Sequence, residues 1–149
     1  MKRSTWIDII SSLFILLFLY TAITKLFDLL HFRNVLYSSP LLHKIVPVVS
    51  LAIPITEIVI SIFLFFPKTR RLGLWASLTL MLLFTGYITY MLYFSPALPC
   101  SCGGVISQMS WKQHLIFNSF FIILAAIGLF LNKKGNKLSG TGLKFSPTI

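Results

Sequence analysis

Both cysteines of the 149-residue chain, Cys100 and Cys102, are separated by one serine and followed by Gly103-Gly104. An extended Cys-x-Cys holds its Cα atoms near the upper limit for a disulfide, so closing the ring requires a tight turn, which the glycines permit directly afterwards. Such a small ring is expected to be strained and easily reduced, which favours thiol/disulfide exchange over a structural cross-link. His114 follows and can assist thiolate formation if the chain folds back.

Two other interpretations of these residues stay open. Two thiolates and the imidazole of His114 suit copper(I) or zinc. A fourth ligand is not evident, so we predict no metal site. In the other interpretation the segment is a packed turn at a membrane surface, with its cysteines reduced or bridged without turnover.

The composition is that of a membrane protein. Hydrophobic residues make up 56% of the chain and charged residues only 11%, about half the charged fraction of a soluble domain. Four stretches reach the roughly 20 apolar residues that a membrane-spanning helix needs. We therefore expect an all-α integral membrane four-helix bundle, with spans at about Ile7–Leu30, Val46–Phe66, Leu72–Phe94 and Trp111–Leu131.

The net charge of +10 is scattered over short loops, which favours membrane topology signals over nucleic-acid binding. The N-terminus, the loop near residue 70 and the C-terminal segment together carry nine Lys and Arg residues, and the two other loops carry three. The positive-inside rule then puts both termini in the cytoplasm and the cysteine loop in the periplasm, where disulfides persist. We divide the chain into a bundle over 1–132 and a flexible basic cytoplasmic tail over 133–149.

Apart from Asp8 and Lys112, which lie next to span ends, three charged residues fall within the apolar spans. Lys25 and Asp28 share a helical face in the first span, as an interfacial ion pair or as functional groups. Glu57 falls near the membrane midplane, three residues after Pro54. An isolated carboxylate there is expensive, so we expect it to be protonated, paired with Lys25 across the bundle, or facing a hydrated cavity.

The fourth span has a clear start signal, because Ser110-Trp111-Lys112-Gln113 has the form of a capping box. This puts His114 in the first turn and Asn118 one turn deeper on the same face. The positive end of the helix dipole disfavours imidazolium, so His114 is expected to be neutral. In the third span, tyrosines at 87, 90 and 93 are predicted to anchor and pack the outer end, with a redox or quinone-stacking role as the less favoured alternative. Thr79 and Gly86, seven residues apart, would permit close helix contact.

Taken together, these motifs resemble the MauE/DoxX-like redox-associated membrane proteins. The similarity extends over all four spans and is carried by five segments: Tyr20-Thr-Ala-Ile-Thr-Lys25-Leu-Phe-Asp28, Pro54-Ile-Thr-Glu57, Phe84-Thr-Gly-Tyr87, Pro99-Cys-Ser-Cys-Gly-Gly104 and Ser110-Trp111-x-x-His114-Leu-x-x-Asn118.

The resemblance implies a four-helix inner-membrane protein of bacteria. The name-giving member of the family is associated with maturation of the disulfide-rich β subunit of methylamine dehydrogenase, together with a thioredoxin-like partner. It implies that Cys100 and Cys102 are the redox pair. It also implies motif roles for Lys25, Asp28, Glu57, Trp111 and Asn118.

The sequence thus predicts a thiol/disulfide redox protein that supports the oxidation or maturation of periplasmic proteins with a separate thioredoxin-like partner. Electrons would pass to or from a membrane carrier such as a quinone, although no residue specifies one. The alternative is a non-enzymatic scaffold or assembly subunit of a larger envelope complex. Transport of a solute or proton fits poorly, because four short helices without an internal repeat leave little room for a pathway.

Overall fold

A computed structural model describes residues 3–94 and 111–139, with side chains described over 4–94 and 112–132. This part of the chain is entirely helical. In chain order the helices are α1 (Arg3–Phe27), α2 (Leu29–Tyr37), α3 (Val46–Phe65), α4 (Arg70–Phe94) and α5 (Trp111–Ser139). The predicted all-α bundle is confirmed.

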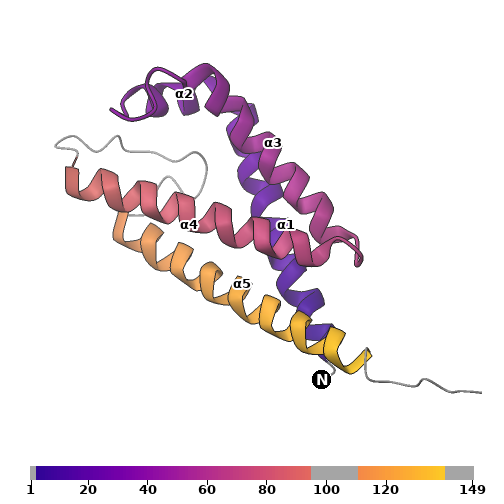
Figure 1. Cartoon of the computed structure of the whole chain (residues 1–149). Helices are drawn as coiled ribbons and strands as arrows, with labels where there is room; N and C mark the ends of the chain where they lie inside the picture. Colours follow the sequence, from indigo (N-terminus) through magenta and orange to yellow (C-terminus); the bar gives the residue numbers. More distant parts are fainter. Residues whose placement is uncertain (1–2, 95–110, 140–149) are drawn as a thin grey trace, which may run out of the picture.

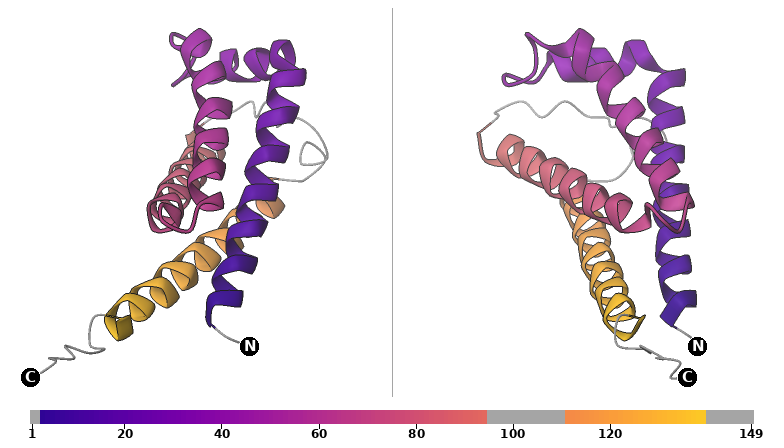
Figure 2. Two further views of the ribbon diagram at one scale, coloured as in Figure 1. Left: turned by 90° about the vertical axis from the view of Figure 1, so that its right-hand side faces the viewer. Right: turned by 45° about the vertical axis from the view of Figure 1, so that its right-hand side comes forward.

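The four long helices form two pairs that cross each other (Figures 1 and 2). Helix α1 packs along α3 and α4 packs along α5, and the pairs meet through α3–α4 and α1–α5 contacts. One end of the bundle holds the start of α1, the turn between α3 and α4, and the end of α5 (Figure 1). The opposite end holds α2, the end of α4 and the start of α5. The helix ends next to the three segments that we assign to the cytoplasm by charge therefore lie at the same end of the bundle (Figure 1). Which side of the membrane this end faces stays a prediction.

The core joins all four long helices. Phe14, Leu64, Leu74 and Ala125 are fully buried, and Phe14 meets Phe121 edge to face with ring centroids 5.2 Å apart. Burial of these large apolar groups is compatible with tight van der Waals packing, which drives helix association inside a membrane.

Small residues allow close approach at a different position from the one expected. A Cβ atom added at Gly73 would lie 2.9 Å from both the backbone nitrogen and Cγ of Leu64, whereas one added at Gly86 would meet nothing within 4 Å. The prediction for Gly86 is wrong. Gly73 follows the short turn from α3, and this turn returns the chain closely enough that only a hydrogen fits there.

The outer surfaces of the long helices are apolar. Four helical stretches are long and apolar enough to cross a membrane, at Ser4–Phe27, Val46–Phe65, Arg70–Phe94 and Lys112–Asn132. Large side chains such as Leu16, Phe65 and Phe130 are about 70% exposed on them. Such surfaces are stable against lipid tails rather than water, so the chain is a multi-pass membrane protein in contact with the bilayer.

Two helix ends differ from the sequence prediction. The first span stops at Phe27, and Asp28 begins the separate helix α2 by accepting a hydrogen bond at 3.3 Å from the backbone N–H of His31. At the other end of the chain, α5 continues to Ser139 instead of ending at Asn132–Gly135. Lysine is a good helix former and a single glycine costs only about 1 kcal/mol, so this polar segment extends the helix.

Candidate functional site

The central feature of the site is an ion pair between α1 and α3. Lys25 Nζ lies 2.5 Å from Glu57 Oε1, and the two side chains are only 15% and 2% exposed. Of the three environments that we considered for Glu57, the structure thus shows pairing with Lys25 across the bundle. A local ion pair between Lys25 and Asp28, one of the two interpretations of these residues, is not what the structure shows, because Asp28 is exposed and caps α2.

Aromatic rings surround the lysine end of the pair. Lys25 Nζ lies 5.8 Å from the ring centroid of Phe32 and 5.2 Å from that of Phe84. Both distances are within the range of cation–π attraction. The ammonium group is therefore held by a carboxylate and by two ring faces that come from α2 and α4.

Helix α2 is held in place by contacts that the sequence alone does not reveal. Arg33 on α2 donates a hydrogen bond from Nε to Ser50 Oγ on α3 at 3.1 Å. Just beyond α2, the Ser39 hydroxyl lies 3.9 Å from the Met91 sulfur on α4, and Leu36 is buried. These contacts connect α2 to both helix pairs.

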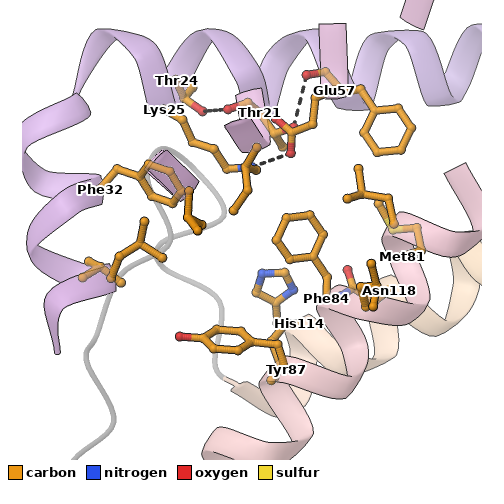
Figure 3. A pocket seen from close by; sticks show the side chains of 18 of the residues that line it. Thr21, Thr24, Lys25, Phe32, Glu57, Met81, Phe84, Tyr87, His114 and Asn118 are labelled. Carbon is orange, nitrogen blue, oxygen red and sulfur yellow. Dashed lines mark hydrogen bonds and ion pairs between the residues drawn. The ribbon is translucent and has the colours of Figure 1, made fainter. Parts of the chain in front are cut away.

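A cavity of about 330 Å³ lies between these helices and α5. Its wall is mostly apolar, with Phe18, Phe84 and Phe117 among the lining residues. Polar side chains enter from three directions: Lys25 from α1, Glu57 from α3, and His114 with Asn118 from α5. Figure 3 shows the ion pair on one side of the cavity and His114 on the other, near Phe84 and Tyr87.

Two buried polar atoms at this cavity have no hydrogen-bond partner within the described part of the chain. They are Glu57 Oε2, on a residue that is 1% exposed, and His114 Nδ1. Buried polar atoms are nearly always satisfied, and an exception calls for an explanation such as a ligand or water. The cavity can thus donate a hydrogen bond to a ligand from the Lys25 ammonium group and accept one at Glu57 Oε2, within a mostly apolar wall.

The structure brings together four of the residues selected from the sequence, which are Lys25, Glu57, His114 and Asn118. Asn118 is buried one turn below His114, as the helical spacing predicts. Asp28 does not line the cavity. Cys100, Cys102 and the Trp111 side chain lie outside the described residues, so their roles stay predictions, as does the alternative in which both cysteines and His114 bind a metal.

Several walls of the cavity could not be predicted from the sequence. Phe32, Met81 and Met91 carry no motif, and their contribution depends on how helices far apart in sequence cross. Tyr87 was assigned with Tyr90 and Tyr93 to anchoring and packing at the helix end, yet Tyr87 lines the cavity, while Tyr93 is 81% exposed. Six residues separate these two positions, so their side chains point about a third of a helical turn apart, and this spacing was the available signal.

The chain was compared with known protein families, with curated proteins and with solved structures. Residues 3–131 match the family described as Methylamine utilisation protein MauE. The match covers the four spans, both cysteines and every polar residue of the cavity. Searches among curated proteins and among solved structures found no match.

Proposed function

Because the chain belongs to the MauE family of membrane proteins, we propose that it is an inner-membrane thiol/disulfide redox protein. In this proposal Cys100 and Cys102 support the oxidation or maturation of periplasmic proteins. Their exchange partner is a separate thioredoxin-like protein. The charge distribution supports a periplasmic position for the segment that contains both cysteines.

The proposed reaction is disulfide exchange. A thiolate of the reduced partner attacks one sulfur of the Cys100–Cys102 disulfide and forms a mixed disulfide. The second partner thiol then resolves it, which releases Cys100 and Cys102 as thiols and leaves the partner oxidised. Two electrons and two protons move from the partner to the cysteine pair, so the step is balanced.

The observation that carries the proposal is the position of the two helices that flank the cysteine segment. Met91 in the last turn of α4 and His114 in the first turn of α5 line the same cavity. The chain between these helices contains both cysteines. The only thiols of the chain are thus tethered, on either side, to helix ends that border a chamber with buried proton-binding groups.

The test measures the redox state of the cysteines and of the partner. In intact membranes, the mass shift after alkylation with and without reductant should show a reducible Cys100–Cys102 bridge, and a membrane-impermeant reagent should label the reduced pair from the periplasmic side. A single Cys100→Ser or Cys102→Ser variant should accumulate a mixed disulfide with a periplasmic protein. Ser101→Ala is the matched control, since it changes the same loop and keeps both thiols.

The double variant Cys100→Ser/Cys102→Ser decides between redox chemistry and scaffolding. We expect periplasmic thioredoxin-like proteins to become more reduced in cells that carry it. An unchanged partner redox state, with normal assembly of a larger envelope complex, would overturn the exchange proposal in favour of a scaffold.

A further inference from the structure

We propose that the cavity between α1, α3, α4 and α5 binds the head group of a membrane quinone. The inference takes its electron donor from the proposed function, the Cys100/Cys102 pair. Binding itself depends only on residues that the structure describes.

The size and lining of the cavity suit a flat apolar ring. Its volume of about 330 Å³ lies at the lower end of the range of small-molecule sites, about 300–1,000 Å³. Phe18, Phe84 and Phe117 line it together with methionine and aliphatic side chains. A flat conjugated ring that enters gains van der Waals contacts with the faces and edges of these rings, whereas a fully hydrated solute would lose most of its water to a largely apolar wall.

The charge of the cavity favours a neutral ligand. Lys25 and Glu57 already neutralise each other at 2.5 Å, so the site offers no net charge to an ion or to a charged lipid head group. A ligand that separated the pair would leave two buried charges unpaired, which is costly. The occupant should therefore be uncharged and should bind beside the intact pair.

The polar atoms of the cavity match the two oxygens of a para-quinone. Lys25 Nζ on one wall and His114 on the other (Figure 3) can each donate to a carbonyl oxygen at opposite edges of a ring. The reduced form carries hydroxyl groups in the same positions. Glu57 Oε2 can accept from one of those hydroxyls, and His114 Nδ1 can accept from the other in the tautomer that carries its proton on Nε2. Both atoms are buried without a partner among the described residues.

The electron balance connects the two sites. Oxidation of the Cys100/Cys102 dithiol to a disulfide releases two electrons and two protons. A quinone that takes up both becomes a quinol, with no further reactant. The proposed exchange reaction consumes the disulfide, so a two-electron acceptor has to regenerate it, and a quinone meets this need.

The test is binding of duroquinone, a fully methylated benzoquinone, to the full chain in lipid nanodiscs. Durene is its counterpart, since it has the same ring and methyl groups but no carbonyl oxygens. Equilibrium binding is measured in the Cys100→Ser/Cys102→Ser background, which contains no thiol, with empty nanodiscs subtracted. We expect saturable binding of about one duroquinone per chain and binding of durene at least about tenfold weaker, the effect of losing one hydrogen bond to a charged group.

Three variants sharpen the test. Lys25→Met/Glu57→Gln removes both charges at nearly constant volume and should weaken duroquinone binding at least about tenfold without changing durene binding. His114→Phe should weaken duroquinone alone and provides a second test if the double variant fails to fold. Lys44→Met removes an exposed lysine that does not line the cavity and should change neither.

Any one of three results would overturn the inference. These are equal binding of duroquinone and durene, duroquinone binding no greater than in empty nanodiscs, and unchanged duroquinone binding in a folded His114→Phe variant. Because the protein in the binding assay contains no cysteine, its result does not depend on the outcome of the exchange test. If the redox state of the partner does not change when both cysteines are replaced, the proposed function is wrong. If the cavity does not bind duroquinone more tightly than durene, this inference is wrong.

Discussion

Helix α1 makes one ion pair near each of its ends, and the two pairs lie in opposite environments. Asp8 accepts from Arg70 of α4 at 2.6 Å, with the Asp8 side chain 53% and the Arg70 side chain 17% exposed. The Lys25 and Glu57 side chains are 15% and 2% exposed, so the two pairs differ at the carboxylate. An exposed pair is held at little cost and contributes little. A buried pair loses hydration that its mutual attraction barely repays, so stability alone does not account for its presence beside a largely apolar cavity.

The helices also pack more closely around the Asp8 end of α1 than around its Lys25 end. Near Asp8, added atoms would collide, because Gly73 approaches the Leu64 backbone and a Cβ at Gly128 would lie 3.3 Å from Ile10 and Leu74 side chains. Near Lys25 the helices instead surround about 330 Å³ of space. One end of the bundle thus fixes the crossing of the helices, and the other holds open a chamber.

The largest effect is expected at the buried pair. Lys25→Met should lower the free energy of unfolding by about 3 kcal/mol, because it leaves the Glu57 carboxylate buried without its partner. Thermal unfolding of the detergent-solubilised protein, followed by circular dichroism, measures the loss.

The control for this prediction is the double variant Lys25→Met/Glu57→Gln, which should recover most of the loss because no unpaired charge remains. If the single and double variants were equally destabilised, the pair would be stabilising in itself, and the contrast between the two ends of α1 would be wrong.

A smaller effect is expected where the helices approach most closely. Gly73→Ala should cost about 1–3 kcal/mol, the usual range for overpacking, because its Cβ would meet Leu64 backbone as well as side chain at 2.9 Å. Gly86→Ala on the same helix points into open space and should be neutral or slightly stabilising. Equal unfolding temperatures for the two variants would show that the end near Asp8 is not packed as described.

The smallest effect is expected at the exposed pair. Asp8→Asn should change the free energy of unfolding by less than about 1 kcal/mol. The difference from the unmodified protein should shrink further when the ionic strength is raised, because salt screens exposed charges. A loss as large as that of Lys25→Met would mean that Asp8 is buried in the membrane-embedded protein.

Much of this architecture follows from composition and periodicity. Runs of about twenty apolar residues have no stable conformation in a bilayer other than a helix, so the four spans could be predicted within a few residues. The helix boundaries were harder to predict where polar residues determine whether the helix ends or continues. Asp28 serves as a cap that starts α2, and Lys133–Ser139 extends α5.

The sequence by itself determined that Glu57 needed a partner or a special environment, and that His114 and Asn118 share a face of one helix. Only the tertiary structure decided which partner Glu57 has. Lys25 is only three residues from Asp28 in the sequence but pairs with a carboxylate 32 residues away. The packing of α1 along α3 brings Glu57 to its side, while the break after Phe27 places Asp28 at the start of α2. Local spacing fixes which residues can share a face, and the crossing of helices fixes what that face meets.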